Sequence, residues 1–298
     1  MARLFNAYVI VHWGASSRPT TGPDSVWIGA LKRDVRFRLA FEAHNPETRA
    51  KGEALLASLL ADRSKRRERA FVGFDFPLGF PRGLAQGLKL PGEAPWRAVW
   101  DQLARMVKDR PDNVNNRFGV GSEINRRLTG GPFPFWGCPP RDALTTLQPR
   151  RGREHGAGDI PEFRHTEVAG DAASPVWKLY YNAAVGPQAI LGIPMVRRLK
   201  TAAGTSMPIW PFETGFKTLG DADLEGIEAV AAEISPSLAP AQPMAGEAKE
   251  AAQLRAIAEH LAKLDEQGKL GALFAPAKTI AADAVLDAER EEGWTLGA

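Results

Sequence analysis

Cysteine is almost absent from this chain, with Cys138 the only one among 298 residues. One cysteine cannot form a disulfide within the chain, which excludes a disulfide-stabilised fold and favours a reducing, cytoplasmic compartment. Cys138 has no basic residue beside it in the sequence and is expected to be an unreactive thiol. No apolar run approaches the roughly 20 residues of a membrane-spanning helix, so no membrane partner is expected.

Phosphate-binding loops and strong charge asymmetry are also missing. The chain contains no GxxxxGK[ST] motif, which argues against a P-loop nucleotide hydrolase. It also lacks convincing glycine turns in both halves, which a sugar kinase or an actin-like ATPase would need. The 38 basic and 35 acidic residues give a formal net charge of +3, which permits an anionic partner without indicating one.

What is present is the composition of a globular protein, 44% hydrophobic and 24% charged. Both ends of the chain show regular apolar patterns, whereas the middle is irregular and rich in proline and tryptophan. We therefore predict one α/β domain over residues 1–298, with a large inserted subdomain at about 76–225.

The first 75 residues predict a strand, a hairpin, a helix and a further strand. The helix is expected to begin near Asn45, with Pro46 at its first position. The hairpin is expected to turn at Lys32-Arg33-Asp34. Because the last of these strands returns through a helix, it should lie parallel to a neighbour. The expected strands span residues 7–13, 25–31, 34–42 and 70–75.

The middle and the end of the chain predict mainly helices. A strand is expected near 206–213, and another, in "GIEAVAAEISPSL", runs into Glu233 and then Pro236. A long arginine-rich stretch, 139–170, is expected to be an exposed loop. The expected helices span residues 94–107, 121–128, 174–186, 192–200, 246–271 and 277–291.

Acidic residues stand where two of these strands end. Asp75 closes the apolar run in "FVGFDFPLGFPRG", and Glu233 closes the last strand. Asp283 and Asp287 lie four residues apart on the closing helix, hence on one face. Strand ends at the edge of an α/β sheet are where sites form, and converging carboxylates repel unless a cation lies between them. The sequence therefore predicts a Mg²⁺ or Mn²⁺ site that uses these four acids.

Four stretches carry a resemblance to a known fold: "VIVHWGAS", "VGFDFPLGFPRG", "VAAEISPS" and "AADAVLDA". Together they resemble a bacterial family of unknown function described as predicted ribonuclease-H-like nucleases. The resemblance implies a mixed five-stranded sheet flanked by helices, with the insertion between the fourth and fifth strands. It also implies metal-dependent cleavage of a phosphodiester, with catalytic positions at Asp75, Glu233 and Asp287.

One position departs from the family pattern, because His12 stands where the family has its first-strand aspartate. A histidine is a poor substitute for a carboxylate that bridges Mg²⁺ ions. His12 is then either a metal ligand or general base of the catalytic set, or an inert histidine at a strand end. The expected function is a metal-dependent phosphodiester hydrolase acting on nucleic acid or a nucleotide. The alternative is a catalytically inactive binding module on the same fold.

Two further groups have both a functional and a structural interpretation. Arginines near "NNRFGVGSEINRRL" could hold a phosphate at a helix N-terminus, or could be solvated surface groups. Aromatic side chains in "VWKLYYN" could stack on bases, or could pack in the core. The residues concerned are Arg117, Arg126, Arg127, Trp177, Tyr180 and Tyr181.

Overall fold

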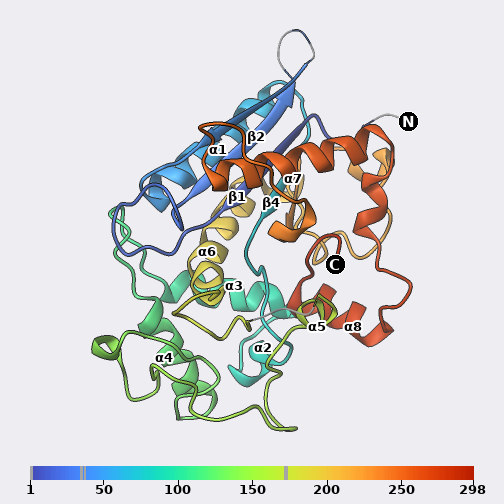
Figure 1. Cartoon of the computed structure of the whole chain (residues 1–298). Coiled ribbons are helices and arrows are strands. Elements are labelled where there is room, and N and C mark those ends of the chain that lie inside the picture. Colours follow the sequence, from blue (N-terminus) through green and yellow to red (C-terminus); the bar gives the residue numbers. More distant parts are fainter. Residues whose placement is uncertain (1–2, 34–35, 37, 171–173) are drawn as a thin grey trace.

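A mixed five-stranded sheet forms the centre of the molecule in a computed structural model that describes residues 3–33, 36, 38–170 and 174–298. The strand order is β3-β2-β1-β4-β5 (Figure 1). Strand β1 pairs antiparallel with β2 and parallel with β4, β2 pairs antiparallel with β3, and β4 pairs parallel with β5. The strands are β1 Ala7–His12, β2 Trp27–Arg33, β3 Leu39–His44, β4 Ala70–Phe74 and β5 Ala229–Glu233.

Both faces of the sheet are covered by helices. Alternate side chains of β1 point to opposite faces, so Val9 and Val11 belong to one buried cluster and Ile10 to another. Helix α7, Lys249–Glu266, packs on the face that holds Ile10, lying across the sheet in Figure 1. The opposite face carries α1, Arg49–Lys65, and α6, Gly186–Ala203. This arrangement explains why β1, β4 and β5 read as continuous apolar runs.

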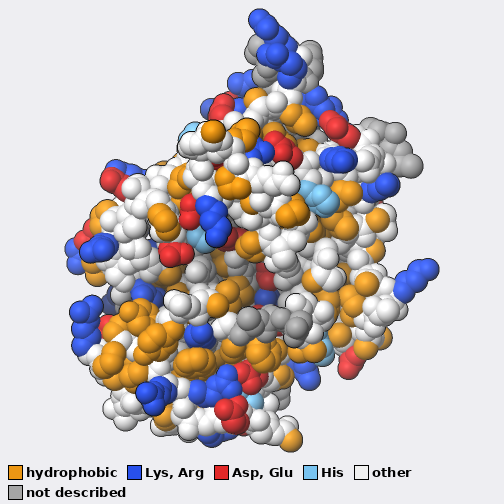
Figure 2. Space-filling model, in the orientation of Figure 1, with side chains coloured by type: hydrophobic (Ala, Val, Ile, Leu, Met, Phe, Trp, Pro, Cys, Tyr) orange, Lys and Arg blue, Asp and Glu red, His pale blue; other side chains and the backbone are white. Residues whose placement is uncertain are grey.

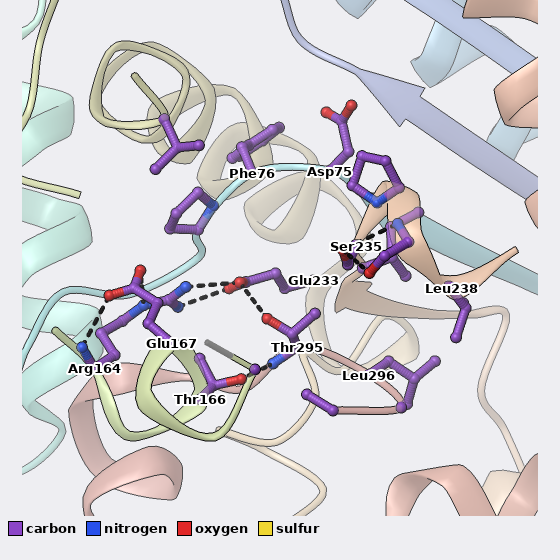
Figure 3. Close-up of a pocket in the computed structure, with 18 of the residues that line it drawn as sticks. Asp75, Phe76, Arg164, Thr166, Glu167, Glu233, Ser235, Leu238, Thr295 and Leu296 are labelled. Carbon is purple, nitrogen blue, oxygen red and sulfur yellow. Dashed lines mark hydrogen bonds and ion pairs between the residues drawn. The ribbon is translucent and has the colours of Figure 1, made fainter. Parts of the chain in front are cut away.

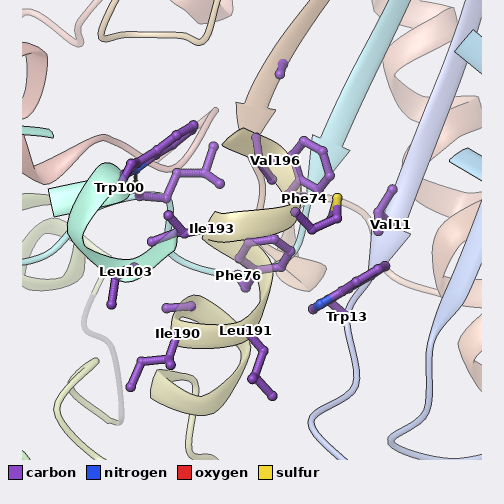
Figure 4. Close-up of a cluster of buried hydrophobic side chains, with 14 of the residues drawn as sticks. Val11, Trp13, Phe74, Phe76, Trp100, Leu103, Ile190, Leu191, Ile193 and Val196 are labelled. Atoms are coloured by element: carbon purple, nitrogen blue, oxygen red, sulfur yellow. Dashed lines mark hydrogen bonds between the residues drawn. The ribbon is translucent and has the colours of Figure 1, made fainter. Parts of the chain in front are cut away.

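The core beneath β1 and β4 continues into the segment after Asp75. Phe74 ends β4 and Phe76 follows the acid, and both are buried against α6 (Figure 4). A β-carbon at Gly192 of α6 would lie 2.4 Å from the ring of Phe76. The missing side chain therefore lets the helix approach the ring closely, which anchors the chain on both sides of Asp75.

A long segment separates β4 from β5, and its helices lie largely beneath the sheet in Figure 1. In it, α3 packs against α6. The helices of this segment before α6 are α2 Leu84–Gly87, α3 Pro95–Met106, α4 Arg117–Leu128 and α5 His165–Ala169. After α7, the chain forms α8, Ala282–Asp287, which continues as a π-helical turn over Ala288–Glu292.

The structure corrects two boundaries in the first part of the chain. Lys32 and Arg33 belong to β2 rather than to the turn, and β3 begins at Leu39; Asp34 of the expected turn lies outside the described residues. Helix α1 begins after Thr48, whose hydroxyl accepts from the N–H of Lys51. Asn45 instead bonds to residues of the β1–β2 loop, because its amide reaches the carbonyl of Val26 at 2.6 Å.

Three expected elements of the later chain were also wrong in type or length. Residues 174–185 form turns rather than a helix, since their apolar side chains fill the core from an irregular backbone. Near 206–213 the chain makes only an isolated bridge, Ile209 with Ala231 of β5. The final helix begins at Ala282 rather than near residue 277.

Two negative expectations concern membranes and cysteine chemistry. Among the described residues, none of the helices combines the length and the apolar character required to cross a membrane. Cys138 is buried, and burial raises the pKa of its thiol, so the reactive thiolate is disfavoured.

Candidate functional site

A cavity of about 440 Å³ opens where the parallel strands β4 and β5 end. Asp75 directly follows β4 and Glu233 is the last residue of β5, and both line this cavity (Figure 3). The two acids predicted from the strand ends are therefore brought to one edge of the sheet. Their carboxylates do not face each other: in Figure 3 that of Glu233 points at Arg164, and that of Asp75 points away from it.

Asp75 is held by the end of β1. Its Oδ2 contacts Nδ1 of His12, and its Oδ1 accepts the backbone N–H of Trp13 at 3.3 Å. The parallel ladder fixes this geometry, because the N–H of Asp75 donates to the carbonyl of Val11 at 3.0 Å. Only 8% of the Asp75 side chain is exposed, against 25% of His12. The carboxylate is thus an orienting partner, and the imidazole is the more accessible member of the pair.

Burial disfavours the charged imidazolium of His12, but the charge and the hydrogen bond of Asp75 outweigh it and raise its pKa. Because the pKa of His12 is raised, the pair contributes its full stabilisation of the fold below about pH 6.5, the pKa of histidine in the unfolded chain. This contribution is lost as the pH rises through the pKa of His12 in the folded protein.

We expect His12→Gln to destabilise the fold by about 1.5–2 kcal/mol near pH 5.5, and by less at pH 8.5. Urea unfolding of both proteins across that pH range measures the difference. A difference that grows with pH would contradict a raised pKa at His12.

Glu233 is buried, and every oxygen it offers is in use. Arg164 donates to both carboxylate oxygens, at 2.7 and 2.8 Å. The N–H of Leu78 and the hydroxyl of Thr295 add bonds of 3.0 and 2.8 Å. A carboxylate that accepts four hydrogen bonds, two of them from one bidentate guanidinium, has no free oxygen to offer a cation.

Arg164 connects three separate parts of the chain at this point. Besides Glu233, its guanidinium donates to Glu167 at 3.0 Å and to the carbonyl of Glu292 at 3.0 Å. Burial opposes the charge on Arg164, but the two carboxylates overcome it and raise its pKa. Burial also disfavours the charged form of Glu167 and so raises the pKa of this carboxyl group, although Arg164 counteracts the effect. The cation therefore stays charged and offsets the negative charge of Glu233 in this part of the cavity wall.

The two acids of the closing helix lie elsewhere. Asp287 lines a different cavity, and its Oδ2 lies 3.0 Å from Nε2 of His165 and 3.4 Å from Nε of Arg82. Asp283 is exposed and accepts the N–H of its neighbour Ala284 at 2.9 Å. Neither lines the cavity that holds Asp75 and Glu233.

The donor set does not fit a two-ion metal centre. Each acid of the three that the resemblance marks as catalytic is paired with a base of the chain itself: Asp75 with His12, Glu233 with Arg164, and Asp287 with His165. Across the described part of the chain, no group of three or more His, Cys, Asp or Glu side chains is arranged to hold a metal ion.

The sequence pointed to His12 but did not reveal Arg164 and His165, the partners of Glu233 and Asp287. Arg164 and His165 lie in the stretch expected to be an exposed loop, yet Arg164 is 1% exposed. One local signal was present, since Glu167 stands three residues after Arg164 and accepts its backbone N–H at 2.9 Å, as at a helix start. That signal marks a helix N-terminus but says nothing of Glu233, 69 residues away.

Comparison with known proteins adds no relative. No family model, no curated protein and no solved structure matches this chain. The geometry of the site therefore carries the functional argument.

Proposed function

We propose that this chain has a ribonuclease-H-like fold with an inserted segment between β4 and β5, and that it acts as a metal-independent binding module. The strand order β3-β2-β1-β4-β5, with a parallel β1–β4–β5 half, supports the fold. The cavity at the ends of β4 and β5 is the binding site, since ligands of open α/β sheets lie at the carboxyl ends of strands.

A single observation carries the proposal: Asp75 and Glu233, the two cavity acids at the strand ends, are already paired with basic residues of the chain itself. Arg164 binds Glu233 bidentately, so this cation occupies the electrostatic role that a divalent ion would fill. His12 likewise forms an ion pair with Asp75. Recruiting an ion would require breaking a buried, fully hydrogen-bonded pair, which is strongly unfavourable.

The remaining lining suits a small polar ligand of nucleoside size. About 440 Å³ lies within the range of small-molecule sites, roughly 300–1,000 Å³. The hydroxyls of Ser235 and Ser237 offer hydrogen bonds, while Pro236 and Leu238 offer apolar surface. Because the charges are paired, recognition rests on hydrogen bonds and shape, as for the uncharged part of a nucleotide.

Binding is tested by calorimetry with the common nucleosides and their monophosphates in the presence of EDTA. We expect one of them to bind, with at least about tenfold weaker affinity for Ser237→Phe, whose ring fills the cavity. Thr201→Phe adds the same ring at an exposed site and should bind as the wild type does. Absence of binding across the panel, or binding that requires Mg²⁺, would contradict the proposal.

One observation favours a second function, hydrolysis of a phosphodiester. The His12 imidazole is oriented by a carboxylate and is partly exposed to solvent, as a general base needs to be. Cleavage of single-stranded, duplex and hybrid substrates, with and without Mn²⁺, distinguishes the two functions. Cleavage that is lost in Asp75→Asn would establish the hydrolase; the binding module predicts none in either protein.

A further inference from the structure

A group of aromatic rings that are at least partly exposed lies on the segment between β4 and β5, and none of them lines the cavity. It consists of Phe118, Tyr180 and Tyr181, here called the aromatic platform. The rings of the two tyrosines lie 4.8 Å apart, and Phe118 meets Tyr180 edge-on at 6.2 Å. Tyr180 is 39% exposed and Tyr181 49%, whereas Trp177 is fully buried in the core. Figure 2 shows hydrophobic side chains mixed with Lys and Arg over the region of α4.

The backbone that presents these rings is strained. Tyr181 has a φ of +74° and Ala183 a φ of +60°, in the left-handed region that side chains with a β-carbon disfavour. Burial of the ring does not compensate the strain at Tyr181, since half of it faces solvent. Strained residues that stay exposed are a recognised mark of binding sites.

Arg117 lies beside the platform, and among the residues that the structure describes no carboxylate pairs with it. Four arginines are buried in the described part of the chain, and Arg49, Arg63 and Arg164 each pair with a carboxylate. Arg117, 8% exposed, contacts only neutral oxygens through Nη1, those of Ser17 and Asn115, both at 2.9 Å. Its Nε is buried without a hydrogen-bond partner.

The pKa of Arg117 reflects its burial first. Burial, and next the charge of Arg49, lower the pKa of Arg117 to about 10, against weaker opposing effects of Asp142, Tyr180 and Asp109. The guanidinium also lies 4.4 Å above the ring of Phe118, which joins it to the platform. A phosphate group would supply the negative charge that this guanidinium lacks.

Arg117 is also the first residue of α4, a helix of 12 residues. Its backbone N–H and its Nη1 share one acceptor, Oδ1 of Asn115, so the guanidinium lies at the helix N-terminus. Asn116 does not cap the helix, because its side chain bonds to Lys108 and Met106 instead. A β-carbon at Gly119 would meet nothing within 4 Å, so the approach is open. These features favour an anion here.

We propose that this surface binds single-stranded nucleic acid, with bases stacked on Tyr180 and Tyr181 and a phosphate at Arg117 and the α4 N-terminus. Unpaired bases offer their faces to aromatic side chains irrespective of sequence. The inference does not depend on the ligand of the cavity. The same segment also contributes Ser174 and Val185 to the cavity wall.

Fluorescence anisotropy with labelled 12-nucleotide dT and rU strands, in EDTA and at several salt concentrations, tests the proposal. We expect Tyr180→Ala/Tyr181→Ala to weaken binding about 30-fold or more, and Tyr181→Phe to leave it nearly unchanged because the ring remains. Arg117→Gln should reduce the slope of log K against log salt by about 0.7, the loss of one phosphate contact, with Arg117→Lys recovering part of it.

Two control variants show whether loss of an arginine, or loss of an exposed apolar side chain, weakens binding when it occurs outside this surface. Arg66→Gln removes an exposed arginine near the start of β4, at the opposite sheet edge, and Met244→Ala removes an exposed apolar side chain; both should bind as the wild type. Each variant is checked for an unchanged thermal transition. Because Ser237→Phe blocks only the cavity, strands should still bind that variant.

Three results would overturn the proposal. The first is no strand binding by the wild type at 50 mM salt, and the second is binding unaffected by the double tyrosine variant. The third is equal affinity for a duplex of the same length, whose bases are not free to stack. Self-association that the double tyrosine variant abolishes, without strand binding, would assign the platform to a protein interface instead.

Discussion

Arg164→Met is expected to destabilise the folded chain by about 3–5 kcal/mol, because it leaves Glu233 buried without its charge partner. Methionine keeps much of the side-chain volume, so the effect reports charge and hydrogen bonds rather than a cavity. The loss also frees Glu167 and the carbonyl of Glu292. Urea unfolding followed by circular dichroism measures the change in free energy.

The matched variant is Arg164→Met/Glu233→Gln. Glutamine carries no charge; its amide oxygen can accept the N–H of Leu78, and its amide N–H can donate to the hydroxyl of Thr295. The double variant should therefore recover at least half of the lost stability. Equal stability of the single variant and the wild type would show that Arg164 does not neutralise Glu233 in solution.

Gly79→Ala is expected to cost about 3 kcal/mol, because the new β-carbon would lie 2.2 Å from the carbonyl oxygen of Glu292 and 2.6 Å from that of Glu291. Both neighbours are backbone atoms and cannot rotate away. The close approach holds the stretch after Asp75 against the end of the chain and places the N–H of Leu78 on Glu233. The stiff Phe-Pro pairs and glycines of this stretch thus serve the cavity wall.

Gly131→Ala is the control, since a β-carbon there meets no atom within 4 Å. Its stability should stay within about 0.5 kcal/mol of the wild type. Thermal unfolding of the two alanine variants gives the comparison. Similar transition temperatures for both would mean that the two backbone segments do not pack as described.

Much of the central sheet could be predicted because its strands are buried on both faces. The apolar runs that end at Asp75 and Glu233 need no tertiary information to be recognised as strands. The parallel pairing of the strand that ends at Asp75 follows from its helical connection. The hairpin boundary was missed because β3 is only partly buried and its pattern is weak. Residues 174–185 were predicted as a helix since apolar spacing alone does not distinguish a helix from a packed irregular segment.

The site was predictable only in part. Strand ends place Asp75 and Glu233 at one edge, and the structure brings them to one cavity. The partners of these acids come from distant parts of the chain: Arg164 from an irregular segment, and Thr295 from the last residues. Nothing local marks such pairs, and it is the pairs that decide whether the acids are free. The prediction that the closing helix contributes ligands to this cavity was wrong, because Asp287 of α8 lines another cavity.

Titration of the wild-type protein with Mn²⁺ by calorimetry tests most directly whether the acids are neutralised from within. The pairing of Glu233 with Arg164 and of Asp75 with His12 predicts no saturable binding up to millimolar Mn²⁺, and no rise in the unfolding temperature. Stoichiometric binding of one or two ions, abolished by Asp75→Asn and accompanied by a higher unfolding temperature, would contradict it.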